Sequence, residues 1–224
     1  MRFAFGFFGL LTAGTLVSCS GVGFGLEAGA IEGVSYPPIS SSVEGQTFLV
    51  EFADVQHTVP TGLSNMWSLL GGKGLLLHVV AEEDAHLEVV LSLSDEEGDQ
   101  SPCEPVHKLP SPDWTNPVFH TPPVSTQLSV GGEPVSIDAF EIEGMFASEG
   151  DYVEDLRLTG VFDIRGLATD AVGDGEACAF VEQLNGECMT CADGQDACVL
   201  MELNVAYAER VGISFDPSLD TSGC

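Results

Sequence analysis

Cysteine is the residue type with the widest chemical reach in this sequence. Cys188 and Cys191 form a CxxC motif, which can act as a redox dithiol or supply half of a zinc site. Cys178 and Cys198 flank it, but the spacings of 9, 2 and 6 intervening residues lack the second CxxC of a zinc ribbon. A redox motif should open a helix, whereas this one precedes an alternating β pattern. Structural disulfides are therefore favoured, with zinc binding and redox chemistry as alternatives.

Carboxylates are the second group that could do chemistry, as ligands of a hard cation such as calcium. The chain has 35 Asp and Glu against 6 Lys and Arg, a net charge of −29, and the acidic residues recur at predicted turns. The loop with Asp170, Asp174 and Glu176 comes nearest to an EF-hand, but Val172 and Val181 occupy two of its ligand positions. Solvated turns are favoured, and weak calcium binding is the alternative. A surface of this charge repels nucleic acid, which we exclude as a partner.

The other catalytic residue types form no recognisable motif. Of the five histidines, only His78 and His86 flank a common turn, where Glu82 and Asp84 could add metal ligands. Two unrelated imidazoles are favoured over a metal site there. Ser64 lacks the GxSxG surroundings of a hydrolase nucleophile, and the sequence has no phosphate loop, HExxH or dinucleotide fingerprint. We therefore expect no enzyme activity and no resident cofactor.

An apolar stretch from Phe3 to Val17 follows Arg2 and ends in Leu16-Val17-Ser18-Cys19. This pattern resembles a bacterial lipoprotein signal peptide with its lipobox. The resemblance implies that residues 1–18 are removed and that Cys19 carries the membrane-anchoring lipid. Ser20, in place of the Asp that retains such proteins at the inner membrane, implies an outer-membrane location, facing the periplasm or the cell surface. The apolar stretch is too short for a membrane-spanning helix, which needs about 20 residues.

With Cys19 assigned to lipid by this resemblance, six cysteines remain in a compartment that oxidises thiols. They allow about 15 pairings, of which we predict Cys178–Cys188, Cys191–Cys198 and Cys103–Cys224. A strand ending in Asp163-Ile-Arg165-Gly-Leu167 precedes a Cys, the CxxC and a further Cys. This order loosely resembles uncharacterised cysteine-containing envelope lipoproteins, a resemblance that implies no activity.

The elements that must position these residues follow from hydrophobic patterns. Residues 19–42 are rich in Gly, Ser and Pro and predict a flexible tether. Residues 43–224 predict one domain, because a chain that is 44% hydrophobic can bury a core. Short helices are predicted at 61–72 and 176–184. Strands are predicted at 46–53, 75–80, 86–93, 135–147, 156–164 and 197–207, with edge strands at 118–120 and 125–130 inside a proline-rich excursion.

These elements predict a mainly β fold, an antiparallel β-sandwich or open barrel of seven to eight strands with one or two short helices, stapled by disulfides. Phe140 and Ile142 should share a core face with Leu158 and Phe162 on the next strand. In the last strand, the odd-numbered residues from Val199 to Tyr207 should point to the core.

The favoured function is a lipid-anchored envelope protein that works as a non-catalytic structural or interaction module. One alternative is a binding protein for a divalent cation or an apolar ligand. The other is an envelope enzyme or a thiol-redox protein that uses Cys188 and Cys191.

Overall fold

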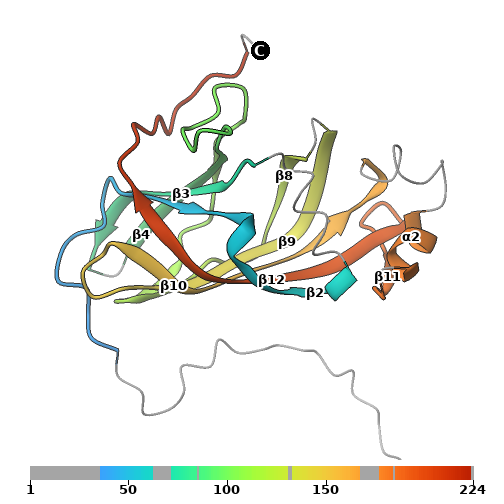
Figure 1. Cartoon of the computed structure of the whole chain (residues 1–224), viewed down its shortest axis with the longest axis horizontal. Coiled ribbons are helices and arrows are strands. Elements are labelled where there is room, and N and C mark those ends of the chain that lie inside the picture. Colours follow the sequence, from blue (N-terminus) through green and yellow to red (C-terminus); the bar gives the residue numbers. More distant parts are fainter. Residues whose placement is uncertain are drawn as a thin grey trace, which may run out of the picture.

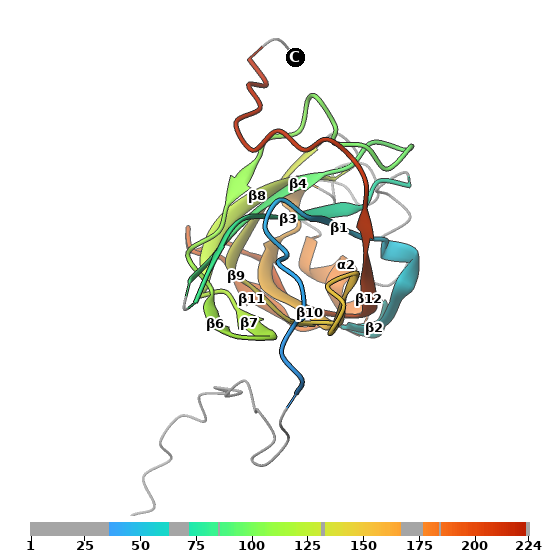
Figure 2. The ribbon, with the colours of Figure 1, turned by 90° about the vertical axis from the view of Figure 1, so that its left-hand side faces the viewer.

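A single antiparallel sheet of 12 strands, curled into a half-barrel, makes up most of the protein (Figures 1 and 2). The computed structural model describes residues 36–62, 72–84, 86–130, 133–166, 177–183 and 185–222. The main path of the sheet runs β5-β4-β3-β1-β12-β10-β9-β7-β6. The strands are β1 (Thr47–Val50), β2 (Val55–Val59), β3 (Leu75–Glu83), β4 (His86–Leu93), β5 (His107–Lys108), β6 (Asp113–Thr115), β7 (Val118–His120), β8 (Val124–Val130), β9 (Glu133–Phe146), β10 (Tyr152–Asp163), β11 (Cys188–Thr190) and β12 (Asp196–Val211).

The predicted fold class is confirmed in part: the protein is mainly β and antiparallel, with disulfides and one short α-helix in the described residues, α2 (Ala177–Gln183), but its strands form one curled half-barrel sheet and not a sandwich of two sheets. The strand count exceeds the predicted seven to eight because several strands have only two to five residues, too few to give a hydrophobic period. They include β5 and β6 in the proline-rich excursion, where prolines interrupt pairing. The predicted helix at 61–72 lies mostly outside the described residues.

Strand β12, although it is the last strand of the chain, lies in the middle of the sheet. One edge of β12 pairs with β10 from Asp163↔Cys198 to Tyr152↔Glu209. The other edge is shared by β11, β2 and β1 in succession. The 3₁₀ turn η1 (Phe52–Asp54) joins β1 to β2 and lets both reach the same strand. One long strand therefore joins the two halves of the sheet.

The inner face of the sheet is packed with apolar side chains that are almost fully buried. Phe146 lies at its centre, with ring centroids 5.4 Å from Phe48 and 5.2 Å from Phe119. The predicted core residues Phe140, Ile142, Leu158 and Phe162 are all buried here. Burial of a Phe, Leu or Ile side chain typically contributes about 1.5–3 kcal/mol to the stability of the fold.

Two β-bulges keep the long strands β9 and β10 facing the core. Ala139 in β9 and Asp155 in β10 have positive φ angles of 49° and 48°, and the pairing register shifts at each. At each bulge, two side chains close together on the bulged strand point toward the core. A glycine on the neighbouring strand lies opposite them and leaves room for both. A Cβ on Gly160 would lie 2.6 Å from Ile137 Cγ2, and one on Gly144 would lie 2.8 Å from Val153 Cγ1.

The prediction that Tyr207 faces the core is wrong. Tyr207 is 45% exposed, while Val205 and Ala208 are buried. Leu156 pairs with Val205 and Val153 with Ala208. Because of the bulge at Asp155, the inward-facing residues Val153 and Leu156 are three positions apart on β10, and their partners on β12 are three positions apart as well. Strict alternation of inward and outward residues therefore fails between Val205 and Ala208.

Segments at both ends of the described chain dock onto the sheet. Before β1, the backbone N–H and hydroxyl of Ser40 both donate to the Ser148 carbonyl. After β12, the ring of Phe215 stacks on that of His78 with 4.5 Å between centroids. Gln100 donates to the Asp216 carbonyl and accepts from its N–H. The C-terminal segment thus covers the outer face of β3.

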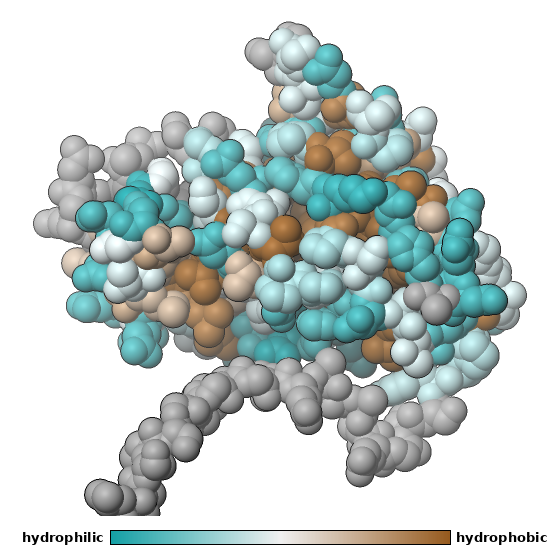
Figure 3. Space-filling model, turned by 180° about the vertical axis from the view of Figure 1, so that it is seen from behind, coloured by the Kyte–Doolittle hydropathy of each residue, from teal (hydrophilic) through white to brown (hydrophobic). Residues whose placement is uncertain are grey.

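On the face seen in Figure 3, hydrophilic residues predominate, with apolar side chains in areas between them. Among the described helices, none is long and apolar enough to cross a membrane.

Candidate functional site

The CxxC cysteines belong to two different disulfides. Cys188 bonds to Cys178, which ties β11 to helix α2, and Cys191 bonds to Cys198 across the β11–β12 hairpin. These are two of the three predicted pairings. Cys103 is also disulfide-bonded, and its predicted partner, Cys224, lies outside the described residues. This pairing favours structural disulfides over a redox dithiol.

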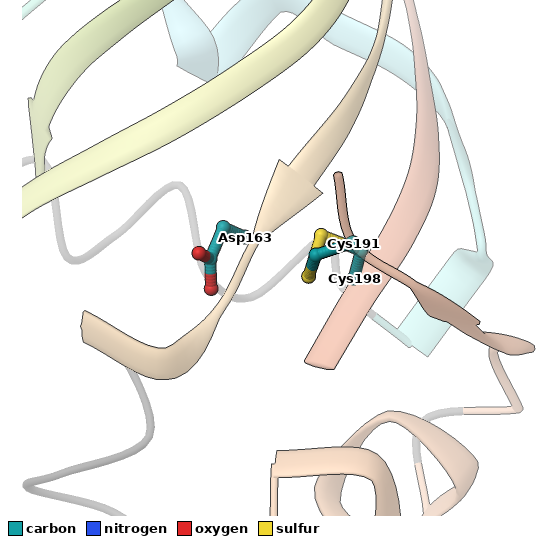
Figure 4. Close-up of side chains that lie close together, drawn as sticks. All are labelled: Asp163, Cys191 and Cys198. Carbon is teal, nitrogen blue, oxygen red and sulfur yellow. A yellow bond between two sulfur atoms is a disulfide. The ribbon is translucent and has the colours of Figure 1, made fainter. Parts of the chain in front are cut away.

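Asp163, Cys191 and Cys198 form the one cluster with metal-ligand geometry among the described residues, since their ligand atoms lie within 4.8 Å of one another (Figure 4). The two sulfurs are bonded to each other, so neither is the thiolate that zinc requires. Asp163 instead pairs with Arg165, which also reaches Asp193 at 2.7 Å. The hydrogen bond from Arg165 holds the pKa of the Asp163 carboxyl below its usual value. The cluster is a staple at the end of β10, not a metal site.

The acidic residues at two described turns have hydrogen-bond partners within the protein. Asp95 Oδ1 accepts hydrogen bonds from the N–H groups of Glu97 and Asp99 in its own turn, both at 3.0 Å. Glu82 accepts from the segment before β1, from the Val43 N–H at 2.8 Å and the Ser42 hydroxyl at 2.9 Å. The first turn satisfies itself, and the second holds the N-terminal segment against the sheet. The calcium candidates Asp170, Asp174 and Glu176 lie outside the described residues.

The two histidines that flank the β3–β4 turn have separate partners. His78 Nδ1 lies 2.9 Å from Thr47 Oγ1, and burial lowers the pKa of this imidazole. His86 Nδ1 lies 3.4 Å from Ser111 Oγ. His86 pairs with Glu83 at the turn, five residues along β3 from His78, so no shared site forms.

An open pocket with a volume of about 620 Å³ lies on the outer face of the sheet, where β10 begins and β12 ends. Its centre is a two-by-two arrangement on paired strands, Tyr152 opposite Glu209 and Glu154 opposite Tyr207. Residues that are directly opposite share a face, and the intervening Val153 and Ala208 are buried on the other side. Its walls are completed by Asp151, Asp155, Ala206 and Arg210.

The pocket combines negative charge with aromatic surface. Its lining residues carry four carboxylates and one guanidinium, and both tyrosines are among the exposed large apolar side chains. The Glu154 carboxylate accepts a hydrogen bond from Tyr152, which raises the pKa of that phenol. Asp151 Oδ1 is buried with no hydrogen-bond partner in the described structure. A positively charged group with apolar surface matches these properties, through ion pairing and cation–π contact.

Sequence reasoning missed this pocket. Alternation along the last strand assigned Tyr207 to the core. Alternation cannot reveal a bulge that moves a tyrosine outward. Acidic and aromatic residues on two paired strands were the available signal.

A second polar cluster lies further along the outer face of the same strands. Arg157 on β10 bridges Glu143 on β9 at 3.1 Å and Glu202 on β12 at 2.9 Å. Asn204 also donates to Glu202. This cross-strand network ties three strands together.

Comparison with known proteins gives no relative. No model of a known protein family matches the chain, and no curated protein or solved structure is significantly similar to it.

Proposed function

We propose that this protein is a non-catalytic binding module, tethered to a bacterial envelope membrane through lipid on Cys19, that holds a positively charged group in the β10–β12 pocket. The observation that carries the binding role is the pocket itself, where two exposed tyrosines alternate with two glutamates on neighbouring strands. Its volume falls in the range of ligand sites, which is about 300–1,000 Å³. The disulfides support a compartment that oxidises thiols.

The chemistry of the pocket favours an organic cation over a bare metal ion. Carboxylates alone would suit calcium, but the tyrosine rings offer surface that only a cation with carbon substituents can use. Lysine and arginine side chains of a partner protein, and quaternary ammonium groups, have this character. The outward bulge at Asp155 presents the site to a large partner.

Titration with tetramethylammonium at constant ionic strength, followed by NMR, tests the pocket. We expect saturable shifts at Tyr152 and Tyr207 that sodium does not reproduce. The double change Glu154→Gln/Glu209→Gln should weaken binding about tenfold, equivalent to about 1.4 kcal/mol. Glu96→Gln/Glu97→Gln removes the same charge from an exposed turn and should leave affinity unchanged. Equal losses in both double variants would mean that only net charge attracts the cation.

The anchor is tested separately by expressing the full chain in a bacterium with labelled palmitate. The native protein should carry label and sediment with membranes, whereas Cys19→Ser should be unlabelled and released. A Cys19→Ser protein that keeps its label would overturn the lipid assignment without affecting the pocket.

A further inference from the structure

Strand β8 forms a long, uncharged edge of the sheet. Within the described part of the chain it pairs with β9 alone, and its other edge has no strand beside it (Figure 1). No residue from 121 to 132 is charged, in a chain with a net charge of −29. The other strands that pair on one side alone are β2, β5, β6 and β11, and they are shorter, with two to five residues. Of these, β5 and β6 contain the charged residues Lys108 and Asp113. Edge strands that lack charges and prolines are templates for pairing with another chain.

The register with β9 determines which backbone groups face this edge. Ser129 lies opposite Pro134, which has no N–H, so this is a non-hydrogen-bonded pair. Pairs alternate along an antiparallel ladder, so Gln127, opposite Ser136, is also in a non-hydrogen-bonded pair. Ser129 and Gln127 therefore direct both N–H and C=O away from β9. Ser125 is the next alternate residue on β8, at the point where the register with β9 shifts between Val124 and Thr126.

The sequence of β8, Val-Ser-Thr-Gln-Leu-Ser-Val, reads almost the same in both directions around Gln127. Two antiparallel copies centred on Gln127 would place Ser125 opposite Ser129 of the other copy, and Thr126 opposite Leu128. The outward-facing positions then match one another across a two-fold axis. A self-complementary patch of this kind is what a two-fold dimer requires.

We propose that two copies of this protein pair through β8, antiparallel, with Gln127 on the two-fold axis. Pairing of Ser125, Gln127 and Ser129 adds about six backbone hydrogen bonds and continues the sheet from one copy into the other. Neither copy of β8 carries a charge, so the paired strands themselves do not oppose carboxylates; Asp138, which accepts from the Ser125 hydroxyl at 2.8 Å, lies one strand further in, on β9. The described end of the N-terminal segment, residues 36–46, lies on the side of the sheet away from β8 (Figure 1).

The oligomeric state tests the pairing. Sedimentation of the mature protein over increasing concentrations should show a monomer–dimer equilibrium. Gln127→Glu puts two carboxylates face to face on the axis and should shift it to monomer, while the matched Gln56→Glu on the exposed surface of β2 should not. A native protein that stays monomeric, or a Gln127→Glu dimer of unchanged strength, overturns the proposal.

Cysteine cross-linking tests the register even if a charge variant folds poorly. With a mild oxidant, Gln127→Cys should form a covalent dimer with itself, because only this residue meets its own copy. Ser125→Cys alone should not, but mixed with Ser129→Cys it should. Efficient self-linking of Ser125→Cys would show that a different register or surface is used.

Discussion

At the scale of single residues, the closest approaches in the sheet occur where a glycine faces a bulge. Gly160 is surrounded by Ile137, Phe162 and Phe140, all on the inner face. These side chains occupy the space that any larger residue at 160 would need. The glycine is therefore fixed by packing, since its φ is not in the left-handed region.

Gly160→Ala should reduce the free energy of unfolding by about 1–3 kcal/mol, because its Cβ would overlap Ile137 in a packed core. Urea unfolding followed by circular dichroism measures the change. Gly212→Ala is the matched control, since a Cβ there meets nothing within 4 Å. Equal stability of the two variants would show that the β9 bulge yields easily.

Arg157→Gln should cost about 1–3 kcal/mol at neutral pH, because it leaves Glu143 and Glu202 without their shared cation. Burial opposes ionisation of Glu202, but hydrogen bonds from Arg157 and Asn204 outweigh it and lower the pKa of its carboxyl.

A lowered pKa contributes stability above the unfolded value of about 4.3, and this stability is lost as the pH falls through the folded value. The difference in the free energy of unfolding between the native protein and Arg157→Gln should thus become smaller below about pH 4. Arg210→Gln, which removes an exposed arginine, should change stability by less than about 0.5 kcal/mol at any pH. If this difference in stability does not change with pH, Arg157 stabilises the fold through packing and not through its ion pairs.

At the scale of elements, the two disulfides join different parts of the fold. Cys191–Cys198 closes a hairpin already held by the Cys191 N–H to Gln195 carbonyl bond of 2.7 Å. Cys178–Cys188 ties helix α2 to the sheet. Only the second links an element that backbone pairing does not secure.

Replacing either pair by alanine should lower stability by about 2–3 kcal/mol, as expected for loops of this length. Hydrogen exchange should separate the two variants. Loss of Cys178–Cys188 should accelerate exchange in α2, whereas loss of Cys191–Cys198 should leave α2 protected. Identical exchange of α2 in both would show that burial of Ala177 and Val181 is sufficient to hold it.

The sequence predicted elements according to their length and period. β3 with β4, and β9 with β10, were placed and paired correctly because their apolar runs are long. The core residues Phe140, Ile142, Leu158 and Phe162 were assigned to the right face. The bulges, the short strands and the position of β12 were not predicted, because pairing partners and register depend on contacts distant in sequence. The pocket was missed because it depends on these features.

At the scale of the whole molecule, the high net charge lowers the stability of the folded state. A chain with a net charge of −29 repels itself when folded, and salt screens that repulsion, with a Debye length of about 10 Å at 0.1 M and 3 Å at 1 M. We expect the melting temperature to rise with sodium chloride. Calcium chloride at the same ionic strength should give the same increase if screening is the cause. A larger increase with calcium would indicate specific binding, in favour of Asp170, Asp174 and Glu176.

The central position of β12 has a consequence for how the chain matures. Before residues 196–211 leave the ribosome, β1–β3–β4 and β9–β10 are separate pieces with open edges, because β12 is the strand that joins them. The sheet therefore cannot be completed until nearly the whole chain has been made. Chains truncated before β12 should fail to fold and be degraded.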